Sequence, residues 1–250
     1  MTRQAYSFVR TFAAGPAREF RVDRHYLLCA SAGALRLEAQ GRAWLLPPAR
    51  AALIEAGRAI QVSIPGPVTT ASALFDTGFT PPPPAPLTVF DLSPLARSLV
   101  AECGAWGDSD QPLTAYAETL FAALAAVTWR LAERPSPVVV PVGRSPELRR
   151  ALRLTEERLD GDVRFEDLAQ EVGLAPRSLA RRFSDETGMT WRAALRRMRL
   201  LRAIEELAAG DTPVTEIAFT VGYTSLSAFN AAFRELTGRT PTDYRASFRP

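Results

Sequence analysis

The sequence contains no lysine, although it has 30 basic residues, so every cationic side chain is an arginine. Only two cysteines occur, Cys29 and Cys103, and their separation fits neither a disulfide framework nor the paired cysteines of a zinc site. His25 is the one histidine, whereas catalytic metal sites normally need several histidine or carboxylate ligands. We therefore expect no metal, no cofactor and no catalytic residue. The sequence also lacks G-x-S-x-G, P-loop and G-x-G-x-x-G motifs.

Long apolar runs are missing as well. No segment approaches the roughly 20 apolar residues that a membrane-spanning helix needs. The N-terminal segment carries Arg10, Arg18 and Glu19 and has no uninterrupted apolar core of the kind found in signal peptides. Together with the scarcity of cysteine, these absences predict a cytoplasmic protein without a membrane partner.

What is present suits an ordinary globular protein of two domains, since 47% of the 250 residues are hydrophobic and 23% are charged. The first third of the chain reads as short strands. Residues Ala34–Ala39 alternate apolar and polar, Gln40 and Gly41 suit a hairpin turn, and Arg42–Leu46 can return beside the first strand. Residues Ile60–Ile64 alternate again. This pattern predicts a sandwich or barrel.

Proline marks the borders of the next segments. The run Pro81–Pro84 predicts an exposed connector, after which Leu92–Cys103 and Leu113–Leu131 have helical spacing. The prolines of Arg134–Pro137 end that pattern, and only helical spacing follows. We expect an N-terminal domain over residues 1–134, with strands to about residue 80 and helices over about 92–134. A linker over 135–146 and a C-terminal all-α domain over 147–250 complete an α+β fold.

The C-terminal region contains a repeat with a period near 50 residues, whose copies begin with Leu168–Leu174 and Ile217–Tyr223. In both copies an alanine precedes a glycine by four residues, and a phenylalanine precedes a later glycine by five. The first glycine permits the positive φ of a tight turn, and the alanine permits two crossing helices to approach closely. The spacing therefore predicts two helix-turn-helix units.

In the second helix of each unit, apolar residues four apart bury one face: Leu179 and Phe183 in the first, Phe229 and Phe233 in the second. The opposite face is then free to enter the major groove of DNA. A plain helical bundle with an ancestral duplication would show the same spacing. The DNA-binding interpretation is favoured because Arg177 and Arg181, one turn apart, lie opposite the apolar stripe of the first unit.

Between the two units, Thr190–Ala209 reads as one amphipathic helix that ends at Gly210. At 1.5 Å per residue it spans roughly 30 Å, close to the ~34 Å between successive major grooves on one face of DNA. The 26 residues Arg177–Arg202 carry a net charge of +6, so the rest of the chain sums to −3. The sequence leaves two roles open for the arginines of this helix, which stand at positions 192, 196, 197 and 199. They either contact DNA phosphates or form ion pairs with Glu205 or Glu206.

These residues resemble the signature of the AraC/XylS family of bacterial transcription regulators. The resemblance covers about Arg149–Arg245 and is carried by Ala175–Phe183, Ile217–Tyr223 and Gly238–Arg245. It implies a monomeric module whose two reading helices enter consecutive segments of the major groove. One departure is Ala175, which stands where a capping serine is usual and so forgoes about 1 kcal/mol of helix stabilisation.

The resemblance implies base-facing residues in each reading helix, and the arginines beside them are expected at the DNA. Arg181 suits bidentate pairing with guanine, Asn230 suits adenine, and Arg234 suits a phosphate. Ala180 and Ala231 can offer a base only an apolar contact, such as one with a thymine methyl group. The full set of expected DNA-binding residues is Arg177, Ala180, Arg181, Arg182, Arg196, Arg197, Ser225, Ser227, Asn230, Ala231 and Arg234.

The N-terminal segments Trp44–Pro48 and Ala56–Ile60 resemble a degenerate cupin-like β-barrel of the kind fused to such modules, with Ile60 where metal-binding cupins have a histidine. We expect a small-molecule effector there, with His25 and Trp44 as candidate contacts, although a structural role is favoured for both, in the core or at the surface for His25 and in the core for Trp44. The expected partners are double-stranded promoter DNA, the effector, RNA polymerase and a second copy of the chain. Two alternatives are a cupin-type enzyme with an appended DNA-binding module and a dimerisation platform without a ligand.

Overall fold

The structure is a computed structural model that describes residues 3–136, 138–161 and 163–247. The chain divides into two compact units, the first made essentially of residues 1–39 and 44–137 and the second of residues 138–246. In the described residues, the first unit combines strands with two helices, and the second has helices alone as its regular elements, which confirms the predicted α+β class. Each unit is described by itself below.

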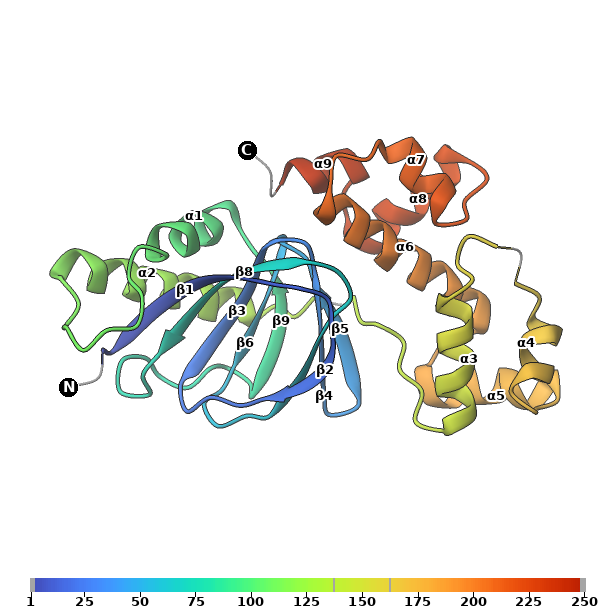
Figure 1. The fold of residues 1–250 in the computed structure, drawn as a ribbon, viewed down its shortest axis with the longest axis horizontal. Coiled ribbons are helices and arrows are strands. Elements are labelled where there is room, and N and C mark those ends of the chain that lie inside the picture. Colours follow the sequence, from blue (N-terminus) through green and yellow to red (C-terminus); the bar gives the residue numbers. More distant parts are fainter. Residues whose placement is uncertain (1–2, 137, 162, 248–250) are drawn as a thin grey trace. The chain divides into compact units, whose positions relative to one another are not determined.

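Nine strands of the first unit form two antiparallel sheets (Figure 1). The five-stranded sheet has the order β1 (Ala5–Phe12), β8 (Val68–Phe75), β3 (His25–Ala32), β6 (Arg50–Ile54) and β9 (Leu87–Asp91). The four-stranded sheet has the order β2 (Gly15–Phe20), β7 (Ile60–Ile64), β4 (Leu35–Ala39) and β5 (Arg42–Leu46). Within the described residues the two sheets do not join into a closed barrel.

The predicted hairpin is confirmed, because Gln40 and Gly41 adopt φ values of 53° and 70° between β4 and β5. Two successive residues with positive φ match the twist of the strands that they join. Strand β9 was not predicted, since the barrel was expected to end near residue 80. It follows the proline connector and pairs with β6 so that Arg50 lies opposite Asp91. Its apolar run directly follows Pro86, so the sequence did not separate it from that connector.

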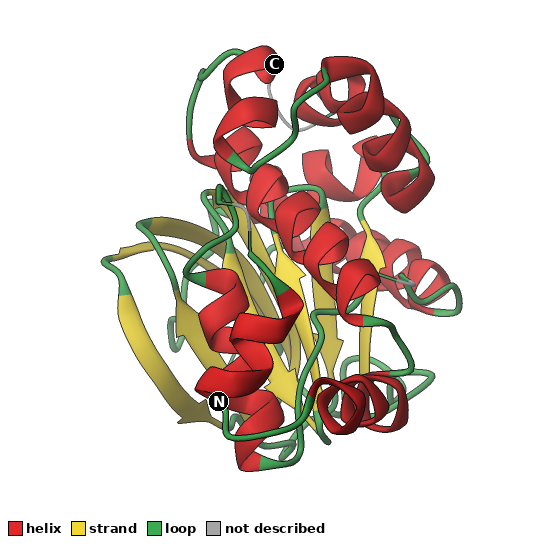
Figure 2. Ribbon diagram, turned by 90° about the vertical axis from the view of Figure 1, so that its right-hand side faces the viewer, coloured by secondary structure: helices red, strands yellow, loops and turns green. Residues whose placement is uncertain are grey.

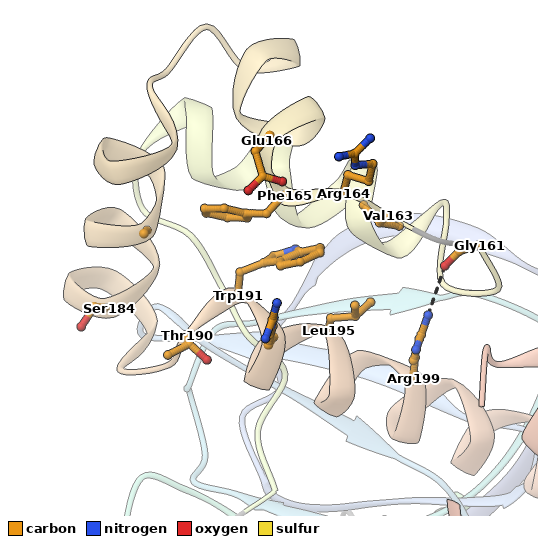
Figure 3. A pocket seen from close by; sticks show the side chains of 12 residues that line it. Gly161, Val163, Arg164, Phe165, Glu166, Ser184, Thr190, Trp191, Leu195 and Arg199 are labelled. Carbon is orange, nitrogen blue, oxygen red and sulfur yellow. Dashed lines mark hydrogen bonds between the residues drawn. The ribbon is translucent and has the colours of Figure 1, made fainter. Parts of the chain in front are cut away.

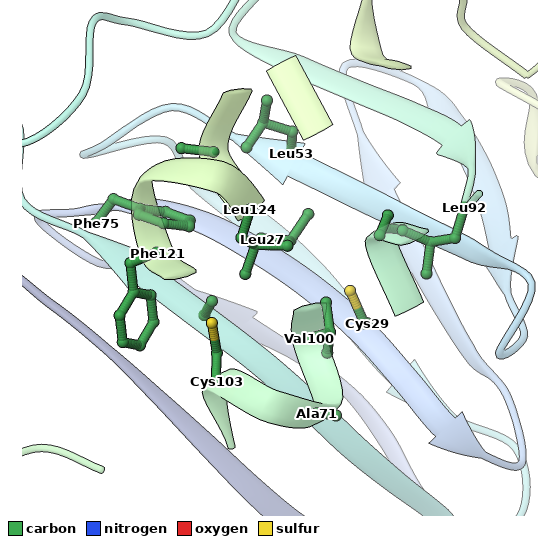
Figure 4. Close-up of a cluster of buried hydrophobic side chains, with 14 of the residues drawn as sticks. Leu27, Cys29, Leu53, Ala71, Phe75, Leu92, Val100, Cys103, Phe121 and Leu124 are labelled. Atoms are coloured by element: carbon green, nitrogen blue, oxygen red, sulfur yellow. The ribbon is translucent and has the colours of Figure 1, made fainter. Parts of the chain in front are cut away.

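Helices α1 (Pro94–Cys103) and α2 (Ala115–Ala132) pack on one face of the five-stranded sheet (Figures 1 and 4). Successive side chains of a strand point to opposite faces, so Leu27 and Cys29 join the core under these helices, and Tyr26 and Leu28 point away from them. Ser93 and Thr114 cap the two helices by accepting a hydrogen bond from the backbone three residues on.

Both cysteines lie in this core as free thiols, on β3 and at the end of α1 (Figure 4). Burial raises the pKa of the Cys29 thiol to about 12. Burial, with a smaller effect from Glu102, raises that of Cys103 to about 12 as well. Thiols in this state are protonated at neutral pH and pack as small apolar groups.

The second unit is built from seven helices in the described residues: α3 (Pro146–Glu156), α4 (Phe165–Glu171), α5 (Pro176–Thr187), α6 (Trp191–Ala209), α7 (Val214–Thr220), α8 (Leu226–Thr237) and α9 (Pro241–Ala246). Helix α6 runs between two groups, with α3, α4 and α5 at its N-terminal half and α7, α8 and α9 at its C-terminal half (Figures 1 and 2). Thr190 caps its start, as a threonine at that position predicts.

The internal repeat is confirmed at the level of the backbone. Gly173 and Gly222 adopt φ values of 73° and 85° in the turns that separate α4 from α5 and α7 from α8. The residue after each glycine donates a backbone hydrogen bond to Ala169 or Ala218, over 2.9 and 3.0 Å. Both alanines are fully buried, so each unit has the tight turn and close helix approach that the spacing predicts.

Two observations bear on membranes and metals. No helix in the described ranges combines the length and the apolar character that crossing a bilayer requires. Nor do three or more His, Cys, Asp or Glu side chains come together there in a cluster fit for a metal ion.

His25 predicts a pH-dependent stability of the first unit. Its ring is buried, accepts a hydrogen bond from the Ala56 amide at Nδ1 over 3.2 Å, and meets the Trp129 ring edge-on. Burial lowers the pKa of His25, with Glu55 and Asp76 acting weakly in the opposite direction. The unfolded chain therefore takes up the proton first as pH falls through about 6.5, and the stability contributed by neutral His25 is lost below that pH.

Urea unfolding at pH 7.5, 6.5 and 5.5 measures this effect. His25→Asn keeps an acceptor near the Nδ1 position and removes the titration, so its free energy of unfolding should change less across this range than that of the wild type. Because His25 is the one histidine of the sequence, the difference between the two profiles isolates its titration. Parallel profiles would contradict the prediction.

The two turn glycines predict unequal costs of substitution. An added Cβ at Gly173 meets nothing within 4 Å, whereas one at Gly222 would lie 2.3 Å from the Leu159 carbonyl oxygen. Gly173→Ala should cost about 1–2 kcal/mol, the strain of a left-handed alanine. Gly222→Ala pays the same strain and a backbone clash, so we expect roughly 1–3 kcal/mol more. Chemical denaturation of both variants checks this, and equal losses would contradict it.

Candidate nucleic-acid interface

Helix α5 is fixed on its inner face by two fully buried side chains, Leu179 and Phe183. The Phe183 ring packs against Phe165 of α4. Beside this apolar stripe, Arg182 pairs with Glu147 of α3 over 2.8 Å and is half-buried. Arg182, expected to bind DNA, thus joins α5 to α3 instead of standing free on the outer face.

A carboxylate anchors the C-terminal end of α5. Glu186 accepts hydrogen bonds from the backbone amides of Arg144 and Ser145 over 2.6 and 2.8 Å, and from the Ser145 hydroxyl over 2.6 Å. Partial burial opposes ionisation, but these donors prevail and keep the pKa of Glu186 below its ordinary value. The N-terminus of α3 and the end of α5 are therefore held together across 41 residues of sequence.

The outer face of α5 carries Arg177, Ala180 and Arg181, all exposed. Neither arginine side chain has a hydrogen bond or ion pair with any residue that the structure describes. Ala175 precedes the helix without a side-chain cap, as predicted, and Pro176 occupies the first turn. The face opposite the buried stripe is therefore cationic and open at two positions.

Helix α8 is held in the same way. Phe229 and Phe233 are fully buried, and their rings belong to an aromatic chain that runs from Tyr223 to Tyr244. The outer face presents an amide, a hydroxyl, a methyl and a guanidinium group on exposed side chains: Asn230, Ser227, Ala231 and Arg234. Ser225, expected to face DNA, is the N-cap of α8 and accepts a hydrogen bond from Ala228 over 3.4 Å.

The arginines of α6 have different environments. Arg192 is exposed and unpaired among the described residues. Arg196 forms an ion pair with Glu235 of α8. Arg197 is half-buried, and burial lowers its pKa. Arg199 turns toward the protein and donates hydrogen bonds to the carbonyl oxygens of Leu159 and Gly161. The sequence left two roles open for these arginines, contact with a DNA phosphate and ion pairing. Within its own unit, Arg199 forms no ion pair with the described residues and instead donates to two backbone carbonyl groups.

A groove of about 720 Å³ borders α5 and the first half of α6 (Figure 3). It is lined by residues of the α3–α4 loop, the start of α4, the outer side of α5 and the start of α6, namely Gly161, Val163, Arg164, Phe165, Glu166, Ala180, Ser184, Thr190, Trp191, Arg192, Leu195 and Arg199. The cationic side chains of Arg164 and Arg192 thus line the same groove as Ala180 of α5.

The first unit has a cavity of about 980 Å³ between its two sheets. Tyr26, Leu28 and Leu74 line it from the five-stranded sheet, and Leu35 and Val62 from the four-stranded one. The Tyr26 hydroxyl lies 3.2 Å from the Ser72 hydroxyl, and burial raises its pKa. Apolar side chains at the opening remain partly uncovered, since Phe12 and Phe20 are 39% and 40% exposed.

Neither candidate effector contact belongs to the described residues that line this cavity. His25 packs against Trp129 of α2 on the helical side of the five-stranded sheet, and Trp44 is buried in β5. The contacts of His25 thus agree with the interpretation that this residue packs in the core. The cavity residues of β1 and β2 were not singled out from the sequence, because no motif distinguishes them from other strand residues.

The chain is similar to known regulators over both its units. A helix-turn-helix domain family model matches residues 168–247. The HTH-type transcriptional regulator NimR of Escherichia coli K12 is 29% identical over 228 residues, which cover 88% of this chain and 79% of that protein. The HTH-type transcriptional activator RhaS of Salmonella schwarzengrund is 32% identical over 150 residues, and the match spans about half of its length, 52%.

Among solved structures, an AraC-type transcriptional regulator from Chromobacterium violaceum is 27% identical with a TM-score of 0.40, and it matches 41% of this chain and 92% of that one. Because this TM-score is low, the assignment depends on sequence: the matched helix-turn-helix model and the regulators aligned with this chain. The C-terminal part of the chain is an AraC-type helix-turn-helix domain, and the chain is a DNA-binding transcription regulator.

Proposed function

We propose that this chain binds a specific promoter sequence by placing α5 and α8 in two successive segments of the major groove. The observation that carries the proposal is the tandem arrangement itself. Each reading helix buries an apolar pair on one side and leaves hydrogen-bonding or charged side chains exposed on the other. Such a protein acts in the cytoplasm, where the chromosome is.

On α5, Arg181 is the residue proposed to read a base. A guanidinium group matches the O6 and N7 acceptors of guanine in a bidentate pair. Arg181 is exposed and makes no competing contact with the described residues. Its N–H donors can therefore bind a base without first breaking an ion pair. Arg177, one turn earlier, is equally open and lies at the start of the helix, where a groove-bound helix contacts DNA first.

On α8, Asn230 is proposed to pair with adenine in a bidentate way: its amide NH2 group donates to adenine N7, and its amide oxygen accepts from the adenine N6 amino group. Ser227 adds a hydroxyl, and Ala231 offers a methyl contact. Arg234, in the last part of the helix, is proposed to hold a phosphate. These contacts would make the second half-site richer in A·T pairs than the first.

Phosphate contacts are proposed for Arg164 and Arg192, the two cationic side chains of the groove beside α5. Both are exposed and unpaired among the described residues. Arg196 and Arg197 stay candidates, although Arg196 would have to share its charge with Glu235. Phosphate contacts fix the register of the protein on DNA and add affinity without sequence preference.

The cavity of the first unit is proposed to bind a small, mainly apolar effector that controls DNA binding. Its size lies within the usual range for small-molecule sites, and such sites combine apolar walls with a few polar groups. RNA polymerase and a second copy of the chain are further proposed partners, on the strength of the family alone.

A cavity-filling variant tests the effector proposal. Val62→Trp adds bulk on the face of β7 that lines the cavity, and Gln61→Trp adds the same bulk on the opposite face as a control. A compound from a library of apolar small molecules that raises the melting temperature of the wild type and of Gln61→Trp, and not of Val62→Trp, supports the site. Equal shifts in all three proteins would exclude it.

Substitution of two arginines separates base reading from phosphate binding. Arg181→Ala should weaken binding to the true operator by roughly 1–3 kcal/mol and leave binding to random DNA nearly intact. Arg192→Ala should weaken both equally and lower the slope of log K against log salt by about 1. Fluorescence anisotropy titrations at several salt concentrations measure both effects. Equal losses on specific and random DNA for Arg181→Ala would refute its role in base reading.

A further inference from the structure

Three segments of the second unit meet at the guanidinium group of Arg199. From the middle of α6, its Nε donates to the Leu159 carbonyl oxygen over 2.9 Å, and its Nη2 donates to the Gly161 carbonyl oxygen over 3.2 Å. Both acceptors belong to the loop between α3 and α4, in the first half of the unit (Figure 3 shows the contact with Gly161). These charge-assisted bonds fix the loop to α6.

The second half of the unit touches the same group. Gly222, in the turn between α7 and α8, lies so close that an added Cβ would be 2.7 Å from Arg199 Nη2 and 2.3 Å from the Leu159 carbonyl oxygen. Glycine at position 222 is favoured both by its positive φ and by the close approach of Leu159 and Arg199. At Gly173, in the first repeat, only the positive φ favours glycine. The turn of the second helix-turn-helix unit thus lies against the α3–α4 loop at one carbonyl group and against α6 at one side chain.

Two other contacts of α6 each serve one half of the unit. Trp191 donates to the Thr155 hydroxyl over 3.2 Å and packs against Phe165, which fixes the first half. Arg196 pairs with Glu235 and fixes α8. Such contacts fix each half of the unit to α6. They do not set the angle between the two halves, which depends on contacts that join one half directly to the other.

We infer that Arg199 is a positioning residue that sets the angle between the two reading helices and thereby the spacing that the protein accepts between its two half-sites. The inference rests on the proposed function. In DNA, one inserted base pair moves the second half-site by about 3.4 Å and rotates it by about 35°. A joint made by a planar group with two hydrogen bonds resists that rotation, whereas α6 without the joint can adapt by repacking at either end.

The test uses the full chain and duplex DNA that the wild-type protein selects from a random-sequence pool. From the selected sequence, duplexes are made with one or two base pairs inserted or removed between the half-sites. We expect the wild type to lose at least about tenfold in affinity with a one-base-pair change. Arg199→Met keeps the aliphatic stem and removes both donors, so it should bind the original duplex more weakly but discriminate spacing by less than about threefold.

Arg192→Met is the matched control, because it removes the same charge from the same helix at an exposed position without a partner among the described residues. It should weaken binding to every duplex by the same factor and keep the wild-type spacing preference. If Arg199→Met does not fold by circular dichroism, Arg199→Lys and Gly222→Ala replace it, with Gly173→Ala as the control for left-handed strain. Gly222→Ala should relax the spacing preference, and Gly173→Ala should not.

The outcomes separate the two claims. If the wild type selects no sequence from the pool, the proposed function fails. If it selects two blocks and the Arg199 and Gly222 variants keep the full spacing preference, the positioning role fails while the proposed function stands. A selected site with a single block would also overturn the positioning role, because there would be no spacing to set.

Discussion

The exposed faces of α5 and α8 depend on the burial of two apolar residues one turn apart in each of these short helices. A helix of twelve residues is marginal in water on its own, so packing decides both whether α5 and α8 form and how they are rotated. Burying Leu179 and Phe183 sets the rotation of α5, and at 100° per residue Arg181 is then turned to solvent. Which side chains of α5 are exposed thus follows from the core beneath them.

The same rotation explains why adjacent arginines have different roles. Arg181 and Arg182 are chemically identical and consecutive, yet a step of 100° carries Arg182 to Glu147 of α3 and leaves Arg181 exposed. On α6, Arg192 and Arg199 are seven residues apart and therefore lie on nearly the same face of the helix. Arg192 is exposed, whereas Arg199, two turns further along, reaches two carbonyl oxygens of the α3–α4 loop. The local excess of positive charge is therefore only partly available to DNA, and part of it holds the helices together.

The sequence predicted the features that depend on local spacing. The turn glycines, the buried alanines and the pairs Leu179–Phe183 and Phe229–Phe233 all follow from short periodic patterns, and the structure confirms them. Features that depend on distant partners were not predictable in the same way. Glu186 binds Ser145 from 41 residues away, and β9 pairs with β6 across the proline connector. The cavity was missed for a related reason, since its walls come from both sheets and no single strand reveals them.

Backbone acceptors make such long-range joints hard to see in a sequence. The Leu159 and Gly161 carbonyl groups would be present whatever side chains stood at those positions. Only Arg199 and the missing Cβ of Gly222 therefore mark this contact in the sequence. In a pattern of amphipathic helix residues, Arg199 looks like any other cation on the polar side. Its role becomes apparent only when the α7–α8 turn and the α3–α4 loop are seen to converge on it. A duplicated unit can thus keep its internal spacing unchanged while a side chain outside the repeat determines how the two copies work together.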